Sequence, residues 1–372
     1  MKVAFLLGSA HVGGGTYVIF QHAIGMVKAG WQVCIVTEEP VLEDQLDWHP
    51  EAKKLLQFVT FNDVVGEDFD IAYATWWRTV YRLHLINARN YFYFVQSIES
   101  RFFEQWDQAA IRWADATYAY DLPTVTEARW IVDYLWNHYG RRAELVRNGI
   151  RKDVYNTNVI PFAPRDPKTL RVLVEGPLNV FFKNVERTVE LCACAQVDEI
   201  WMMTSTKRLS RYSFCDRVFS CIPIHDAARV YASCDVVVKL SYVEGMFGPP
   251  LEMFHCGGTS IVYDVTGHDE YIRAGENSLV LSRDDEEGVI LALNALKNDQ
   301  EHLEFLKFNA LNTAASWPSW ELASQGFISA TTRLLEQPSP SRQALMSWNR
   351  ALSGWYEAHV KAQSELHEKY VS

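Results

Sequence analysis

The sequence has few of the features that mark disulfide-bonded, zinc-binding or membrane-spanning chains. Only seven of its 372 residues are cysteines, and none of them forms a Cys-x-x-Cys pair. An odd number of thiols without such spacing argues against a disulfide framework and against a structural zinc site. No run of 18 apolar residues occurs, and the apolar start is too short for a signal peptide. These absences predict a soluble cytoplasmic protein with reduced thiols.

Positive charge is also scarce. The chain has 35 basic and 46 acidic residues, which gives a net charge of −11. This balance argues against a nucleic-acid-binding protein and against a protein held on a membrane by charge alone. We therefore expect no nucleic-acid partner and at most a peripheral contact with the inner face of the cell membrane. Hydrophobic residues make up 48% of the chain, which is enough for two well-packed domains.

Short apolar runs alternate with helical patterns along most of the chain. They are apolar on successive residues, which is typical of strands buried on both faces of a parallel sheet. In the first half the runs are Lys2–Leu7, Gln32–Thr37, Gln57–Phe61, Ile71–Trp76, Tyr91–Gln96, Ala116–Asp121 and Glu144–Asn148. In the second half they are Leu170–Glu175, Glu199–Thr204, Arg217–Ile222, Val236–Leu240, Ser260–Val265 and Ser278–Ser282.

The spacing of prolines and helical patterns divides the chain into parts. Residues 157–168 contain Pro161, Pro164 and Pro167 and resemble a linker. We predict two doubly wound α/β domains over residues 1–158 and 159–340, with helices after Asp285 closing the second. Residues 341–372 are predicted to form a C-terminal helix that packs back on the first domain. A Thr-x-x-Glu capping box at Thr124 and Glu127 predicts a helix over residues 124–139.

The segment 235–258 carries the clearest chemical signal. Its pattern predicts a buried strand at Val236–Leu240, then a loop containing Glu244, then a helix that opens with Pro249 and ends at Gly257. A loop at the carboxyl end of a parallel strand, leading into the start of a helix, is where α/β sheets bind anions and nucleotides. Free N–H groups and the positive end of the helix dipole favour phosphate at this place.

Two carboxylates flank this predicted anion site. We expect Glu252 in the first turn of the helix, where it can accept hydrogen bonds from two ribose or sugar hydroxyls. Glu244, before the helix, would meet a second polyol. An anion site between two such carboxylates fits a nucleoside-diphosphate sugar. The alternative interpretation is that Glu252 is an ordinary carboxylate that stabilises the helix dipole.

This arrangement resembles the donor-site signature of retaining glycosyltransferases of the GT-B fold, family four. That signature has two glutamates with seven residues between them, glycine and proline in that interval and small residues at the helix end. Four further segments resemble family motifs in the correct order along the chain: Val146–Ile150, Asp226–Asp235, Thr266–Glu270 and Gly275–Val280. The resemblance implies two Rossmann-like domains that face each other across a cleft, with a C-terminal helical segment.

A finer resemblance concerns three segments. Tyr93–Glu99, Ala74–Trp77 and Pro249–Met253 are similar to the bacterial branch that includes rhamnosyltransferases of cell-surface glycans. The resemblance implies transfer of a hexose or deoxyhexose, such as rhamnose, from a nucleoside-diphosphate sugar to a glycan or lipid-linked acceptor. It implies retention of anomeric configuration and a place in surface-polysaccharide biosynthesis.

The resemblance also assigns roles on the donor side. It implies that Glu244 and Lys183 stabilise the transition state and that Glu252 holds the ribose. The remaining donor-binding candidates are Phe247, Gly248, Pro249, Arg187, Gly14 and Gly15. The chain departs from the family where Pro177 stands in place of an arginine, and Arg187 is the candidate replacement. No cofactor is implied, and no metal is expected because Lys183 and the helix N–H groups would hold the diphosphate.

On the acceptor side the candidates are Gln96, Glu99 and Trp76. Gln96 stands where many relatives carry a histidine, and an amide cannot take a proton, so no general base is expected there. Asp68 and Asp70 have the spacing of a metal-binding pair, but they precede a buried strand and are interpreted as an ordinary turn.

Three other functions stay open. The missing arginine and histidine are compatible with a catalytically silent paralogue that binds nucleotide or glycan as a subunit. A sugar phosphorylase or a sugar-nucleotide epimerase could share this architecture. A dinucleotide-dependent dehydrogenase is disfavoured, since the glycines after the first strand do not form Gly-x-Gly-x-x-Gly.

Overall fold

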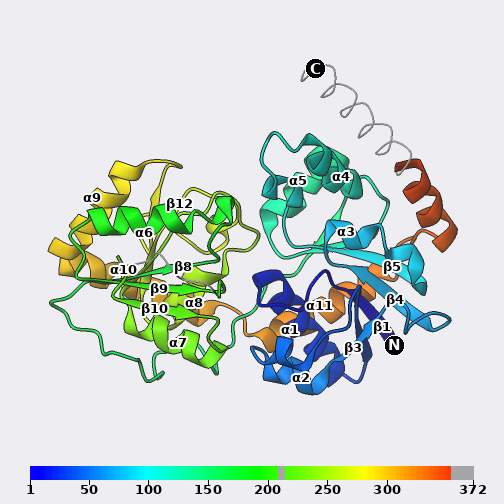
Figure 1. The fold of residues 1–372 in the computed structure, drawn as a ribbon, viewed down its shortest axis with the longest axis horizontal. Coiled ribbons are helices and arrows are strands. Elements are labelled where there is room, and N and C mark those ends of the chain that lie inside the picture. Colours follow the sequence, from blue (N-terminus) through cyan, green and yellow to red (C-terminus); the bar gives the residue numbers. More distant parts are fainter. Residues whose placement is uncertain (208–213, 353–372) are drawn as a thin grey trace.

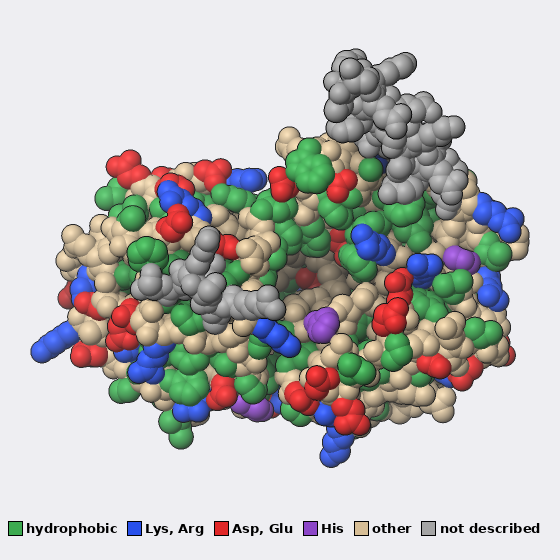
Figure 2. Space-filling model, viewed as in Figure 1, with side chains coloured by type: hydrophobic (Ala, Val, Ile, Leu, Met, Phe, Trp, Pro, Cys, Tyr) green, Lys and Arg blue, Asp and Glu red, His purple; other side chains and the backbone are tan. Residues whose placement is uncertain are grey.

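Every strand pair in the described part of the chain is parallel, and the strands form two separate sheets. The computed structural model describes residues 1–207 and 214–352, and it places one sheet in each of two lobes (Figure 1). Figure 2 shows a hollow between these lobes.

The sheet of the first domain has seven strands in the order β3-β2-β1-β4-β5-β6-β7. The strands are β1 (Lys2–Leu6), β2 (Gln32–Thr37), β3 (Gln57–Thr60), β4 (Asp68–Ala74), β5 (Asn87–Val95), β6 (Thr124–Thr126) and β7 (Ala143–Leu145). Alternate residues of β1 enter different cores: Val3 and Phe5 pack on one side of the sheet, and Ala4 and Leu6 on the other. Both faces are therefore covered, which explains the continuous apolar runs.

The sheet of the second domain has six strands in the order β10-β9-β8-β11-β12-β13. They are β8 (Arg171–Glu175), β9 (Glu199–Thr204), β10 (Arg217–Ser220), β11 (Val236–Lys239), β12 (Thr259–Tyr263) and β13 (Leu279–Leu281). In both sheets the order reverses direction beside the first strand of the domain, between β1 and β4 and between β8 and β11. Ligands bind at such reversal points in doubly wound folds, at the carboxyl ends of the strands.

Most helices fall between strands, and those after Asp285 follow the last described strand, β13. Those of the first half are α1 (Gly14–Lys28), α2 (Pro50–Leu55), α3 (Trp77–Val80), α4 (Gln108–Tyr118) and α5 (Arg129–Tyr139). Those of the second half are α6 (Val185–Cys194), α7 (Ile224–Ser233), α8 (Gly248–His255), α9 (Glu286–Asn298), α10 (Gln300–Ser316) and α11 (Trp320–Leu334). Single 3₁₀ turns occur at η1 (Glu43–Leu46), η2 (Leu83–Leu85), η3 (Glu99–Phe102), η4 (Phe181–Lys183) and η5 (His268–Glu270).

Two predictions in the first domain were wrong. The run at 116–121 is not a strand, because its first residues complete α4, whose amino end is capped by the Asp107 side chain. The predicted capping box at Thr124 and Glu127 does not form either. Residues 124–126 form β6, which pairs with β5 and β7, and the next helix begins only at Arg129.

The domain boundary predicted at residue 340 also needs correction. Helix α11 belongs to the first domain, where Phe327 and Leu334 enter the core beside α1 (Figure 1). The hydroxyl groups of Tyr73 and Thr331 are hydrogen-bonded at 2.8 Å. The chain thus returns after α10 to cover the first sheet. An amphipathic pattern reveals that a helix has an apolar face but not which sheet covers that face.

The two connections between the domains lie side by side. The Ile150 N–H donates to the Pro318 carbonyl at 3.1 Å, and the Trp320 N–H donates to the Ile150 carbonyl at 3.2 Å. A Cβ atom on Gly149 would come within 2.4 Å of the backbone at Ser319, so this crossing needs a glycine. Gly149, which lies in the Val146–Ile150 segment that resembles a family motif, therefore has a packing role at the domain junction.

Helical residues 342–352 pack on the first domain. The Asn349 amide donates to the Tyr81 carbonyl at 2.7 Å and accepts from the Tyr120 hydroxyl at 3.1 Å, while the Arg342 guanidinium donates to the His84 carbonyl. The rest of the predicted C-terminal helix, residues 353–372, lies outside the described residues. In the described part of the chain, no helix has the length and apolarity that crossing a membrane requires.

Candidate active site

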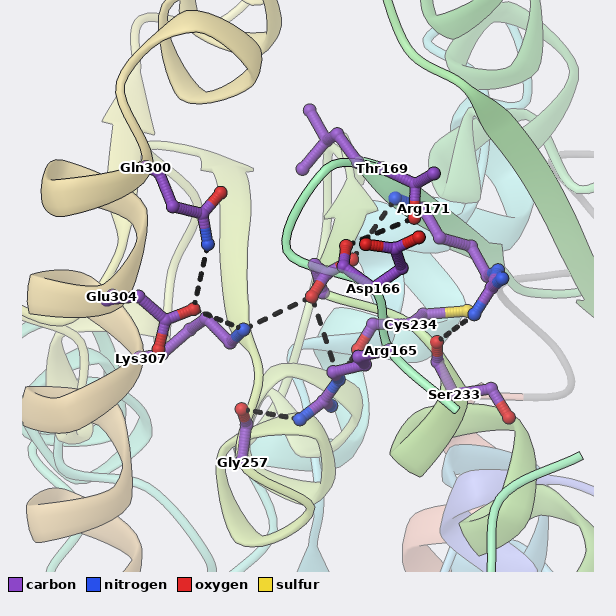
Figure 3. A network of polar contacts seen from close by, with 12 residues as sticks. Arg165, Asp166, Thr169, Arg171, Ser233, Cys234, Gly257, Gln300, Glu304 and Lys307 are labelled. Carbon is purple, nitrogen blue, oxygen red and sulfur yellow. Dashed lines mark hydrogen bonds and ion pairs between the residues drawn. The ribbon is translucent and has the colours of Figure 1, made fainter. Parts of the chain in front are cut away.

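The carboxyl end of α8 is fixed by a linker residue, which aims the amino end of the helix. The Arg165 guanidinium donates to the carbonyls of Cys256 and Gly257 at 3.1 and 2.8 Å, where a helix end favours positive charge. Figure 3 shows this network, in which Lys307 contributes a second cation. Arg165 and Lys307 both reach Asp235, which directly precedes β11. The linker thus ties the carboxyl end of α8 to the start of the strand that leads into it.

The amino end of α8 follows the carboxyl end of β11, at the reversal point of the second sheet. Gly248 is the first helical residue, and no heavy atom lies within 4 Å of where its Cβ would be. Pro249 and Pro250 occupy the first turn, where a missing N–H costs nothing. Phe247 precedes the helix and is fully buried. The helix start is therefore open to a ligand beside Gly248.

Lys183 and Glu244 form an ion pair beside this helix start. The Lys183 Nζ donates to the Glu244 Oε2 at 2.8 Å, and Glu244 is buried. Burial raises the pKa of Glu244, but the charges of Lys183 and Lys239 outweigh it and hold that pKa below the ordinary value. The second oxygen, Oε1, is buried without a hydrogen-bond partner in the described part of the chain. A carboxylate kept ionised with one free oxygen can accept a ligand hydroxyl.

A second ion pair, between buried Lys239 and half-buried Glu175, lies beside the first. The Lys239 Nζ donates to the Glu175 Oε2 at 2.7 Å and to the Glu175 carbonyl at 3.0 Å. Gly176 has a φ of 145° and approaches both lysines, so a side chain there would be strained. Sequence reasoning missed Lys239 and Glu175. The only available signal was a lysine at the end of an otherwise apolar strand.

Glu252 lies further along α8 than expected. It is the fifth helical residue, in the second turn, so the prediction of a first-turn carboxylate was wrong. Burial and the charge of Glu175 raise its pKa to about 7, while hydrogen bonds from Tyr231 and Tyr155 lower it in part. The carboxyl can therefore both donate to and accept from a polyol near neutral pH.

The first domain meets this site through the backbone around Gly245. A Cβ on Gly245 would lie 2.1 Å from the Gln96 carbonyl oxygen. The Trp130 Nε1 donates to the Gly245 carbonyl at 2.9 Å, and the Met246 N–H donates to the Glu127 Oε1 at 2.9 Å. The two domains are thus in direct contact at the loop that carries Glu244.

Other first-domain candidates lie near this contact. The amide of Gln96 is in contact range of the Cβ position of Gly15, and Gly14 next to it is exposed with open space around it. Phe102 stacks on Phe182, next to Lys183, with ring centroids 4.8 Å apart. The glycine-rich start of α1 and the Gln96 loop therefore face the second domain.

Three predicted site residues make no described contact with Lys183 or Glu244. Arg187 is exposed, and its guanidinium pairs with Glu286 and Glu190. Glu99 is buried and accepts from the Trp77 N–H at 2.7 Å, and burial raises its pKa to about 8. Trp76 is half-buried and packs on Gly8.

The aspartates with metal-site spacing lie toward the amino ends of the strands of the first sheet, whereas the candidate sites lie at the carboxyl ends. Asp68 begins β4, and the Asp70 carboxylate accepts from the Lys2 N–H at 2.8 Å. They therefore lie in the first half of β4, away from the carboxyl ends of the strands.

Glu127 is a buried carboxylate that sequence reasoning assigned to a helix cap. Its Oε2 accepts from the Asn148 amide at 2.8 Å, and burial raises its pKa to about 7. In the unfolded chain this carboxyl loses its proton near pH 4.5, whereas in the folded protein it keeps the proton up to about pH 7. The free energy of unfolding therefore falls as pH rises between these two values. The folded protein should therefore lose stability between pH 5 and 8 because of this group.

We expect Glu127→Gln to reduce that loss. The glutamine keeps an acceptor for the Met246 N–H, and the Asn148 Oδ1, which lacks a partner among the described residues, can accept from the new amide after a flip. The free energy of unfolding, measured by urea titration at pH 5 and pH 8, should fall less in the variant by on the order of 2 kcal/mol. Equal falls in both proteins would contradict the assignment.

Solved structures with the same architecture identify the fold. HepE of Anabaena, solved in complex with UDP-glucose, superposes with a TM-score of 0.73 at 16% identity, over 90% of this chain and 100% of that chain. The chain has the GT-B fold. The fold prediction is thus confirmed.

Further GT-B structures agree. Sucrose-phosphate synthase from Thermosynechococcus elongatus has a TM-score of 0.72 at 15% identity, over 90% of this chain and 99% of that chain. WaaG, a glycosyltransferase involved in lipopolysaccharide biosynthesis, has a TM-score of 0.67 at 15% identity, over 89% of this chain and 99% of that chain.

A family model matches the part of the GT-B chain that holds the candidate site. Residues 182–299 match the family described as glycosyl transferases group 1. This segment contains Lys183, Glu244, Glu252 and the whole of α8. No curated protein sequence matches the chain.

Proposed function

We propose that this protein transfers a hexose or deoxyhexose from a nucleoside-diphosphate sugar to a glycan or lipid-linked acceptor, with retention of anomeric configuration. The observation that carries the proposal is the Lys183–Glu244 ion pair at the open start of α8. It combines a cation, the N–H of Gly248 at the helix start and an unpaired carboxylate oxygen in one place. The glycosyl transferases group 1 match over residues 182–299 supports it.

In this proposal the diphosphate of the donor rests on the amino end of α8. Lys183 has three N–H donors and uses one for Glu244, so two are available for phosphate oxygens. The bond between the sugar C1 and the phosphate oxygen breaks, and negative charge grows on the leaving diphosphate. Lys183 and the helix dipole stabilise that charge.

The acceptor hydroxyl attacks the same face of C1. Its oxygen forms the new bond, and its proton passes to the departing phosphate oxygen. Gln96 orients hydroxyl groups without taking the proton, because an amide is not a base at neutral pH. The free Oε1 of Glu244 accepts a hydroxyl of the transferred sugar, and Glu252 accepts from the ribose. These residues need no metal ion in their proposed roles.

The surrounding process follows from the resemblance in sequence. We assign the enzyme to the synthesis of surface polysaccharide, with rhamnose as one candidate sugar and the cytoplasmic face of the membrane as its place of action. WaaG and HepE, which share the fold, are respectively a glycosyltransferase of lipopolysaccharide biosynthesis and a protein solved with UDP-glucose.

A thermal-shift screen tests the donor class. UDP, GDP, dTDP and their sugars are added to the protein, and the cognate nucleotide at 100 times its Kd should add about 2.7 kcal/mol of stability. The cognate donor should then be hydrolysed slowly or transferred, with the released sugar first seen by NMR in the donor's anomeric form. Binding without turnover of any donor would instead favour the silent-paralogue function, and an inverted product would contradict retention.

Replacing Glu252 with alanine should weaken binding of the nucleotide found in that screen by on the order of 10-fold. The reason is the loss of the half-buried carboxyl that is proposed to grip the ribose. Calorimetric titration of Glu252→Ala measures the change, and Glu301→Ala, an exposed glutamate on α10, is the control. Unchanged nucleotide affinity in Glu252→Ala would reject the ribose role.

A further inference from the structure

A cavity of about 920 Å³ opens at the carboxyl ends of four neighbouring strands of the first sheet. Phe61 follows β3, Glu38 follows β2, Gly8 follows β1 and Trp76 follows β4, and all four line it. This edge includes the reversal point between β1 and β4, where doubly wound sheets bind ligands. The cavity is in the other domain from the candidate donor site.

The cavity is basic although the chain as a whole is acidic. Arg78, Arg82 and Arg350 line it, and Glu38 is the one acidic residue among the described residues that line it. The Arg82 Nε pairs with the Glu38 Oε1 at 3.2 Å. Within residues 1–207 and 214–352, no carboxylate forms an ion pair with Arg78 or Arg350. Two guanidinium groups are therefore available to an anion in a protein whose net charge is −11.

Arg78 is held by neighbouring rings, and Arg350 is placed by the helical segment that carries it. The Arg78 guanidinium lies over the rings of Trp76 and Trp77, at 5.1 and 5.0 Å from the ring centroids. Arg350 follows Asn349, whose amide donates to the Tyr81 carbonyl at 2.7 Å. Helical residues 342–352 thus bring the Arg350 guanidinium to the cavity.

We propose that this cavity binds an anionic glycan as the acceptor, which extends the proposed function and rests on it. Guanidinium groups pair with carboxylate or phosphate through two parallel hydrogen bonds. The Phe61 ring in the cavity wall offers a flat apolar face to a sugar ring. An acidic sugar unit held by Arg78 and Arg350 would leave the rest of the glycan free to extend toward the donor site.

The chain connects this cavity to the donor side. Gly8 begins the loop that runs to Gly15 at the start of α1, and Gly15 lies against the Gln96 side chain. Gln96 in turn contacts Gly245, next to Glu244. Chain connection and side-chain contacts thus link the cavity around Trp76 to the loop that carries Glu244.

Calorimetric titration with three small carbohydrates tests the proposal. Trigalacturonic acid carries carboxylates, glucose 6-phosphate carries a phosphate on a sugar, and maltotriose is neutral. We expect at least one anionic probe to bind at least 10-fold more tightly than maltotriose, and the tighter one identifies the anion. Arg78→Ala combined with Arg350→Ala should weaken that binding by on the order of 10- to 100-fold. Arg89→Ala, an exposed arginine outside the cavity, should not.

The nucleotide thermal shift separates this proposal from the donor function. If the double variant keeps the nucleotide shift and loses the anionic glycan, the cavity assignment is supported. If the double variant binds the anionic probes as tightly as the unmodified protein, or maltotriose binds as tightly as they do, the assignment is overturned while donor binding stands. Absence of any nucleotide shift in the unmodified protein would count against the donor function instead.

Discussion

Replacing Lys183 with alanine should lower turnover of the cognate donor by on the order of 100-fold, which is typical of losing one charge-stabilising donor. The lysine is half-buried, and its Nζ is 2.8 Å from Glu244, which lies in the loop before α8. Its loss removes the positive charge from the leaving diphosphate. It also leaves Glu244 with Lys239 as its remaining cationic neighbour, so the pKa of Glu244 should rise.

The pH dependence of the variant gives a second readout of the same pair. If the pKa of Glu244 rises, the carboxylate becomes protonated at a higher pH than in the unmodified protein. The variant should therefore lose activity at a higher pH as the solution is made more acidic. Steady-state rates of donor hydrolysis from pH 5 to 8 measure both effects. Lys168→Ala, an exposed lysine in the linker, is the control. Full turnover in Lys183→Ala, with an unchanged acidic limb, would remove Lys183 from the reaction.

Replacing Gly245 with alanine should lower turnover by on the order of 100-fold for a different reason. The added Cβ would lie 2.1 Å from the Gln96 carbonyl oxygen and 2.7 Å from the Glu127 Oε1. Backbone cannot move aside as a flexible side chain can, so the loop carrying Glu244 must shift away from the first domain. A displacement of about 1 Å at a reacting group can cost on the order of 100-fold in rate.

A helical glycine provides the matched control. Gly326 lies in α11, where an added Cβ would meet its nearest atom, in Val146, at 3.6 Å, an ordinary contact. Gly326→Ala should therefore keep full activity. Circular dichroism should show that Gly245→Ala remains folded, because each domain keeps its own core. Equal activity in the two alanine variants would mean that the Gly245 contact is not needed for transfer.

Most of the strands could be predicted because burial on both faces makes them visible as apolar runs. The run at Glu199–Thr204 corresponds to β9 in full, and Lys2–Leu7 extends β1 by one residue. The exceptions are instructive. Thr117 and Tyr118 favour strands by residue type, yet the cap at Asp107 starts a helix that includes them. Strand β6 was missed because Thr124 and Glu127 have the spacing of a capping box, which predicts the start of a helix at the same residues.

The candidate site was predictable where it is local in sequence and not where it depends on long-range packing. Glu244, Gly248 and Pro249 lie in one continuous segment, and so their common location follows from one strand-loop-helix unit. Glu127 comes from 117 residues before Glu244 and meets its loop only through the contact between domains. The placement of α11 on the first domain is of the same kind, because it depends on which sheet has an uncovered face.

A crystal structure with the cognate nucleoside-diphosphate sugar, chosen by the thermal-shift screen, tests the central claim most directly. We predict the diphosphate at the amino end of α8, with a phosphate oxygen within hydrogen-bond distance of the Lys183 Nζ. The sugar should reach the Glu244 Oε1, and the ribose should reach Glu252. A donor bound elsewhere, with the start of α8 empty or blocked, would contradict this account.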